Sequence, residues 1–241
     1  MWETVASLLR DRFFVVATDQ PGHGDSDPAP DDGWDFTKFA DYLKQALEEI
    51  GMQNAVGVGH SSGSTTLMLC EAANPGTFSR LLLIEPIVPL GAGQWQLDSN
   101  PMAQAARRRR PGFESPDAMV EAFRDRPPFS TWTGEALRLY AVQGTRAEDG
   151  RVVLKCQPEH EARFYEAIAR VDSEPIRTVR CPALLVQGEL SDGIRAGMFN
   201  RAREVLPQAE VRTVTGAGHF IPQEQPSTVA RMIEEFAAGA T

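Results

Sequence analysis

Short apolar runs that alternate with helical patterns constrain the fold of this chain more than any other feature of its sequence. In the first of these runs, residues 13–18, apolar residues follow one another without the apolar–polar alternation of a half-buried strand. Continuous runs of this kind are typical of strands that are buried on both faces of a parallel sheet. The predicted strands comprise residues 13–18, 55–58, 81–84, 183–186 and 211–214.

Segments with apolar residues at helical spacing separate these predicted strands. Residues 36–50 carry such a pattern, and Gly51 follows as a typical helix terminator. Further helices are expected over residues 62–73, 193–206 and 227–237. Strands that alternate with helices predict an α/β fold with a mostly parallel sheet flanked by helices.

Residues 91–179 interrupt the alternation with short helical patterns and many Pro and Gly residues. Ser115 before Pro116 is typical of a helix start, with an N-cap and a proline at the first helical position. We therefore divide the chain into a first core part over residues 1–90, a helical insertion over the sheet at residues 91–179, and a second core part over residues 180–241. The expected helices of the insertion are residues 101–109, 115–124, 135–142 and 159–170.

Composition excludes several classes of protein. The 241 residues are 42% hydrophobic and 24% charged, as in soluble globular domains. A formal net charge of −9 argues against general nucleic-acid binding, which needs a basic surface. No apolar run approaches the roughly 18 residues that a membrane span needs. Three scattered cysteines form neither a disulfide framework nor a CxxC metal site and are typical of the cytoplasm. We therefore expect no cofactor and no metal ion, and the oligomeric state stays open.

A nucleophile motif lies between a predicted strand and a predicted helix. It reads Gly59-His60-Ser61-Ser62-Gly63, which is G-x-S-x-G. In this context the glycines permit a sharp turn that exposes the Ser61 hydroxyl, and the helix N-terminus favours developing negative charge. We predict Ser61 as the nucleophile and the Ser62 backbone N–H as an oxyanion-hole donor. The alternative is a Gly/Ser-rich turn without chemistry.

A serine nucleophile needs a base, and the chain has four histidines. His219 lies in a Gly-rich loop after the last predicted strand, at the sheet end where parallel-sheet active sites gather. We predict His219 as the base. His23 is expected to be structural, His60 to point away from the nucleophile, and His160 to be an exposed helix residue.

The base needs a carboxylate that orients it. Asp192 follows the fourth predicted strand and is the preferred candidate, although it could instead be the N-cap of the next helix. Glu189 and Glu85 are rivals at the same sheet end. The order Ser61, Asp192, His219 is that of the α/β-hydrolases and differs from the orders of the two unrelated serine-protease groups.

On these motifs the chain resembles the lidded, serine esterase-like enzymes of the α/β-hydrolase fold. The segments that carry the resemblance are residues 19–26, 59–63, 84–86, 188–192 and 218–222, with Glu224 and Pro226. The resemblance implies that residues 91–179 form a lid over the substrate pocket. Epoxide hydrolases and haloalkane dehalogenases of this fold use an aspartate nucleophile, so Ser61 argues against both.

The chain departs from that family at its beginning. It starts with a helical pattern that includes Trp2, Val5 and Leu8, where the family first has two strands and then the oxyanion-loop strand. Roughly thirty residues are absent by typical strand and loop lengths. The resemblance thus implies that the first strands and the second oxyanion donor are missing. Either the start given is internal, or the protein is a truncated copy with impaired activity.

The motifs together predict a hydrolase that uses a Ser61–His219–Asp192 triad through an acyl-enzyme. The expected substrate is a small or medium carboxylic ester. A carbon–carbon bond hydrolase acting on a dicarbonyl compound would use the same triad. A catalytically dead remnant or a binding protein on the same scaffold is the alternative from another class.

Overall fold

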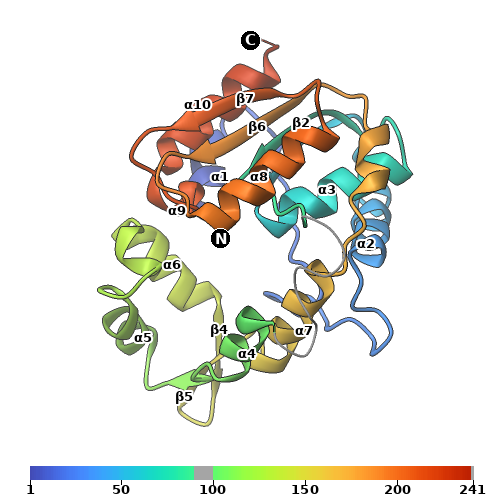
Figure 1. Ribbon diagram of the computed structural model, residues 1–241. Coiled ribbons are helices and arrows are strands. Elements are labelled where there is room, and N and C mark those ends of the chain that lie inside the picture. The colour runs from blue at the N-terminus through green and yellow to red at the C-terminus, as the bar shows by residue number, and fades with distance from the viewer. Residues whose placement is uncertain (90–99, 240–241) are drawn as a thin grey trace.

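The computed structural model describes residues 1–89 and 100–239 and shows the expected α/β architecture (Figure 1). The main sheet has the strand order β1-β2-β6-β7, and all neighbouring strands are parallel. The prediction of a mostly parallel sheet flanked by helices is therefore confirmed. The strands are β1 (Ala55–His60), β2 (Phe78–Ile84), β6 (Ala183–Gly188) and β7 (Glu210–Val214).

Strand β2 illustrates why continuous apolar runs form the centre of this sheet. Side chains alternate between the two faces of a strand. Leu81 and Leu83 pack in one core cluster with α2 (Phe36–Glu49), α3 (Ser62–Ala73) and α8 (Gly193–Val205). Leu82 and Ile84 pack in a second cluster with α1 (Glu3–Leu9) and α10 (Pro226–Ala237). Because helices cover both faces, every position of the run is buried.

The predicted strand over residues 13–18 is wrong. These residues form no strand, and the Phe14 side chain is 85% exposed. An apolar run signals burial, but a strand also needs hydrogen-bonded neighbours. Among the described residues, β1 pairs with β2 alone, and no strand lies between β1 and residues 13–18. The described sheet therefore has four strands where the sequence predicted five.

The four expected helices of residues 91–179 are present, apart from small shifts of their ends; residues 91–99 lie outside the described part. The helices are α4 (Pro101–Arg107), α5 (Pro116–Phe123), α6 (Gly134–Gln143) and α7 (Pro158–Ile168). Two single-turn helices, η2 (Phe129–Thr131) and η3 (Glu174–Thr178), accompany them. The sequence reasoning missed a small antiparallel sheet with the order β3-β5-β4. Its strands are β3 (Gly112–Phe113), β4 (Thr145–Glu148) and β5 (Arg151–Leu154).

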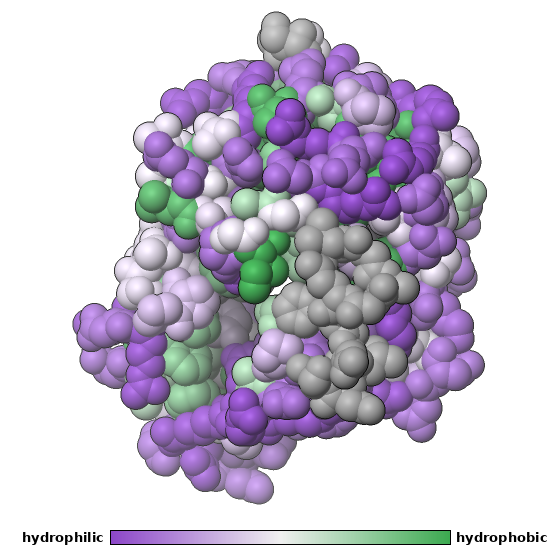
Figure 2. All heavy atoms as spheres, in the orientation of Figure 1, coloured by the Kyte–Doolittle hydropathy of each residue, from purple (hydrophilic) through white to green (hydrophobic). Residues whose placement is uncertain are grey.

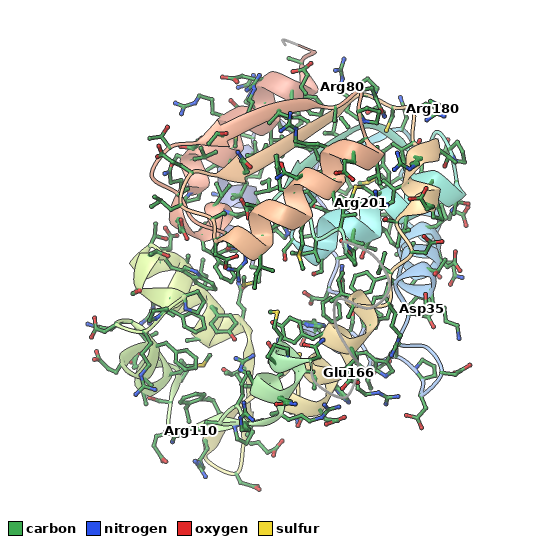
Figure 3. The ribbon with its side chains drawn as sticks, viewed as in Figure 1. Asp35, Arg80, Arg110, Glu166, Arg180 and Arg201 are labelled. Carbon is green, nitrogen blue, oxygen red and sulfur yellow. The ribbon has the colours of Figure 1, made fainter. Side chains whose placement is uncertain are left out.

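Aromatic residues form two of the places where the inserted segment contacts the main sheet unit. Phe164 of α7 stacks on Phe39 of α2, with ring centroids 5.8 Å apart. At the other end, Trp132 packs against Phe220, with centroids 5.2 Å apart, and the Thr133 N–H donates to the Gln223 carbonyl. In Figure 3 the insertion lies below the sheet unit. Glu166 lies on α7, the helix that packs against α2, and Arg110 lies at the end of the insertion away from the sheet unit.

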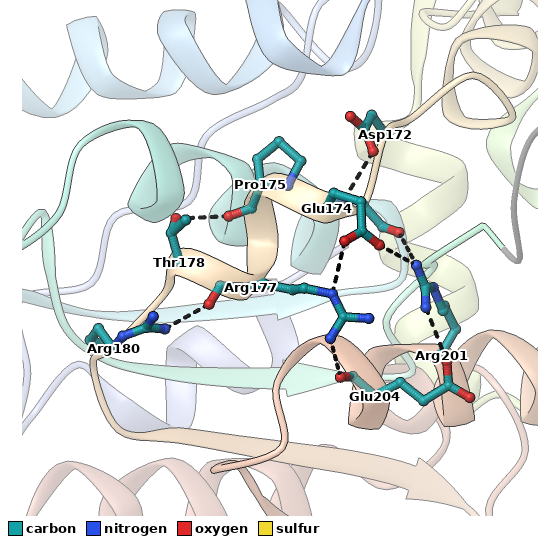
Figure 4. Close-up of polar contacts among 9 residues, drawn as sticks. Asp172, Glu174, Pro175, Arg177, Thr178, Arg180, Arg201 and Glu204 are labelled. Atoms are coloured by element: carbon teal, nitrogen blue, oxygen red, sulfur yellow. Dashed lines mark hydrogen bonds and ion pairs between the residues drawn. The ribbon is translucent and has the colours of Figure 1, made fainter.

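Helix α8 is tied to the segment that returns from the insertion (Figure 4). The Arg201 guanidinium donates to Glu174 of η3 at 2.7 Å and to Glu204 at 3.0 Å. Arg177 donates to the Glu204 carbonyl oxygen at 2.8 Å and to Glu174 at 2.9 Å. Partly exposed pairs of this kind contribute little individually, but a network of several restricts the position of the helix. None of the described helices is long and apolar enough to cross a membrane.

Candidate active site

Ser61 occupies a strained turn between β1 and α3. Its φ of 56° and ψ of −122° lie outside the regions that non-glycine residues favour, at a typical cost of about 1–3 kcal/mol. Gly59 permits the turn, since a Cβ there would lie 2.6 Å from the Ser64 backbone nitrogen. A Cβ on Gly63 would meet nothing within 4 Å, so this second glycine is not required by contact with any described residue. The strain presents the Ser61 hydroxyl at the carboxyl end of the sheet.

The structure brings Ser61 and His219 together as the sequence predicted. The Ser61 Oγ lies 3.1 Å from His219 Nε2, and His219 Nδ1 lies 3.1 Å from Glu85 Oε2. His219 is 9% exposed and Glu85 is 3% exposed. A carboxylate can only accept at Nδ1, so this contact places the proton of the neutral ring on Nδ1. Nε2 is then free to accept the serine proton.

Glu85 is held rigidly beside the imidazole. It follows β2 with a φ of 48°, and its N–H donates to the Val186 carbonyl at 2.7 Å. Its second carboxylate oxygen, Oε1, accepts the Gly188 N–H at 2.7 Å. Burial raises the pKa of the Glu85 carboxyl, and the Gly188 hydrogen bond opposes this rise. Of the carboxylates that the sequence offered, Glu85 has the geometry of an orienting group.

The structure does not bring Asp192, the preferred sequence candidate, against His219. Asp192 is the N-cap of α8, and its Oδ1 accepts the Arg195 N–H at 2.9 Å. Its Oδ2 pairs with the Arg195 guanidinium, and the side chain is 52% exposed. In the described residues, the contact to His219 Nδ1 comes from Glu85 instead. Glu189, the other rival, accepts the Gly216 N–H and thereby holds the loop before His219.

His60, which was expected to point away from the nucleophile, makes a contact to the base that the sequence reasoning did not include. Its Nε2–H donates to the His219 carbonyl oxygen at 2.8 Å, and the two ring centroids are 4.9 Å apart. It therefore faces the base and supports the His219 main chain. His160 is partly buried against Trp34 and is not the exposed residue expected. His23 packs edge-on against Phe164, in agreement with a structural role.

The electrostatic environment keeps both imidazoles neutral. Burial lowers the pKa of His219 to about 3, and the nearby Arg195 guanidinium acts in the same direction. Burial also lowers the pKa of His60 to about 3, with a further contribution from His219. A neutral His219 is the form that can accept a proton from Ser61.

We expect the lowered pKa of His60 to make stability pH-dependent. The unfolded chain takes up a proton on this histidine below pH 6.5 and the folded protein does not, so the free energy of unfolding falls as the pH falls. Between pH 7.5 and 5.5 this loss is about 1.4 kcal/mol. Urea unfolding of His60→Gln, whose amide keeps a donor in place, should show a correspondingly smaller loss. An equal loss in both proteins would contradict this expectation.

A cavity of about 1420 Å³ opens onto the Ser61 hydroxyl. Ser61, Ser62 and His219 line its wall, together with residues 13–20 and with Phe164 and Tyr165 of α7. Ser62 is the first residue of α3, where backbone N–H groups lack carbonyl partners within the helix. Figure 2 shows a mostly hydrophilic face with hydrophobic residues bordering a hollow between the sheet unit and the insertion.

Comparison with known proteins agrees with this fold. A family model described as "Alpha/beta hydrolase family" matches residues 1–232. The chain belongs to this family. The alpha/beta hydrolases that resemble it include the bifunctional esterase/perhydrolase DCH of Acinetobacter calcoaceticus, which is 36% identical over 253 residues, covering 95% of this chain and 83% of that protein.

Two further similarities concern one type of enzyme. A 2-(acetamidomethylene)succinate hydrolase of Mesorhizobium japonicum is 26% identical over 240 residues, covering 98% of this chain and 82% of that protein. A crystal structure of E-2-(acetamidomethylene)succinate hydrolase aligns with a TM-score of 0.84 at 26% identity, covering 98% of this chain and 87% of that chain. These relatives of the present alpha/beta hydrolase are named as hydrolases of small molecules.

Proposed function

We propose that this alpha/beta hydrolase is a serine hydrolase whose catalytic residues are Ser61, His219 and Glu85. The observation that carries the proposal is the continuous contact from Ser61 Oγ through His219 to Glu85. A serine, a histidine and a buried carboxylate in this relation form the arrangement that activates a serine hydroxyl in unrelated hydrolases. Glu85 takes the role that the sequence reasoning gave to Asp192.

The geometry supports a two-step reaction. Ser61 Oγ attacks the carbonyl carbon while His219 Nε2 takes the hydroxyl proton, and His219 returns this proton to the leaving alcohol. The Ser62 N–H is the proposed donor to the developing oxyanion. Water then gives a proton to His219 and attacks the acyl-enzyme, which releases the carboxylic acid and restores Ser61.

We infer that the substrate is a small or medium carboxylic ester. A cavity bordered by apolar residues accepts the acyl or alcohol part beside Ser61. The residues 91–179 then act as a lid, because Phe164 and Tyr165 of α7 contribute to the cavity wall. The esterase name of the relative at 36% identity agrees with this substrate class.

Covalent labelling tests the proposed nucleophile directly. A fluorophosphonate probe should label the protein with one equivalent, and peptide mass spectrometry should place the label on Ser61. Heat-denatured protein is the control, because labelling needs the activated hydroxyl and not a free serine. Absence of label on folded protein, or label at another serine, would refute the proposal.

A further inference from the structure

Arg195 introduces a cation into the wall of the catalytic cavity. Among the described residues that line this cavity, which include Ser61 and His219, Arg195 is the single lysine or arginine. It lies in the first turn of α8, just beyond the carboxyl end of β6. Because the carboxyl ends of parallel strands lie at one edge of the sheet, Arg195 shares that edge with the proposed catalytic residues.

The guanidinium acts electrostatically on the reacting groups. Arg195 lowers the pKa of His219, and it contributes in the same direction at His60 and Glu85. Arg195 shares the cavity wall with Ser61, His60 and His219. The network around Arg201 and Glu174 restricts α8 and thereby the position of Arg195 (Figure 4).

Arg195 keeps free hydrogen-bonding capacity. Its side chain is 31% exposed, and its contact to Asp192 is made through Nη1. Within residues 1–89 and 100–239, neither Nε nor Nη2 has a hydrogen-bond partner. Asp192 also caps α8 and so anchors the guanidinium at the cavity wall. A guanidinium with two adjacent unused donors matches the two oxygens of a carboxylate.

Of the carboxylates that line this cavity within the described residues, Asp192 alone contacts the Arg195 guanidinium. Glu161 pairs with Arg109, which lies outside the cavity wall. Asp19 accepts the Asp25 N–H at 3.1 Å. Neither carboxylate is a partner of Arg195, and the ion pair with Asp192 engages Nη1 and leaves the edge formed by Nε and Nη2 open to a second anion.

We propose that Arg195 selects ester substrates whose acyl or alcohol group carries a carboxylate at the end remote from the scissile bond. This inference rests on the proposed serine hydrolase activity. The substrate carboxylate binds the free edge of the guanidinium while the ester carbonyl lies beside Ser61. The enzyme then prefers a half-ester of a dicarboxylic acid to a neutral ester of the same length.

Two substrates of equal acyl length test this preference. We compare kcat/KM for mono-p-nitrophenyl adipate and p-nitrophenyl hexanoate in the wild-type protein, Arg195→Gln and Arg195→Lys. Arg203→Gln is the matched control, because it removes the same charge from the last turn of the same helix. The adipate-to-hexanoate ratio should fall on the order of 10- to 100-fold in Arg195→Gln, chiefly through KM, and stay unchanged in Arg203→Gln. Arg195→Lys should recover part of the preference.

The outcomes separate this inference from the proposed function. Ser61-dependent hydrolysis of the neutral hexanoate ester reports the serine hydrolase alone, and its absence overturns that proposal. With that hydrolysis present, an unchanged adipate-to-hexanoate ratio in Arg195→Gln overturns the role of Arg195. An equal fall for both esters also overturns it, because Arg195 would then act on the reaction through His219. Plateau rates from pH profiles are compared, since Arg195→Gln also raises the pKa of His219.

Discussion

Replacing Ser61 by alanine is expected to lower kcat for p-nitrophenyl butyrate by on the order of 10⁵- to 10⁶-fold. The variant lacks the oxygen that forms the acyl-enzyme, and His219 then has no hydroxyl to activate. Folding should be almost unaffected, because alanine keeps the Cβ of serine at the same φ of 56°. Initial rates and thermal unfolding, measured on the same samples, separate lost chemistry from lost structure.

The matched control for this variant is Ser227→Ala. Ser227 is exposed in the first turn of α10, away from the cavity wall, and its hydroxyl has no part in the proposed reaction. It should keep wild-type kcat and KM. Equal turnover by the wild-type protein and Ser61→Ala would mean that the observed hydrolysis does not use the triad.

The sequence predicted Ser61 and His219 because each depends on local chain geometry. A G-x-S-x-G turn between a strand and a helix exposes its serine whatever the rest of the protein does. His219 follows the last strand in a Gly-rich loop, and the sheet topology brings this loop to the same edge. Both residues could therefore be placed from motif and order alone.

The orienting carboxylate could not be placed in the same way. Glu85 and Asp192 follow β2 and β6, which are adjacent strands of the sheet. Either residue therefore reaches the same edge. The choice depends on side-chain direction: Asp192 turns to the N–H of Arg195, and Glu85 turns to His219. Hydrophobic patterns carry no information on such directions.

Two errors in the predicted secondary structure have similar causes. The apolar residues 13–18 resemble a buried strand, but strand formation depends on a neighbour that a local pattern does not specify. The β4–β5 hairpin was missed although Asp149-Gly150, both with positive φ, is a strong hairpin signal. The charged, exposed residues of β4 lack an apolar alternation, so the sequence pattern did not indicate a strand there.

Replacing Glu85 by glutamine should lower kcat/KM for p-nitrophenyl butyrate by on the order of 10⁴-fold. The neutral amide stabilises the imidazolium less well, and its NH₂ can face Nδ1 and favour the tautomer with the proton on Nε2. That tautomer cannot accept the Ser61 proton. Burial of a changed hydrogen-bond pair should also cost about 1–3 kcal/mol of folding stability. Kinetics and urea unfolding at one pH measure the two effects separately.

The informative comparison is Asp192→Asn, an equally conservative change in the carboxylate that the sequence favoured. Asparagine is a good N-cap, so α8 should keep its start and its stability. With Glu85 in contact with His219, we expect the activity of Asp192→Asn on the neutral ester to fall less than about 10-fold, which corresponds to 1.4 kcal/mol of transition-state stabilisation. If Asp192→Asn lost more activity than Glu85→Gln, Asp192 would be the orienting group during turnover. The ratio of the two activity losses therefore shows whether the orienting carboxylate is Glu85 after β2 or Asp192 after β6.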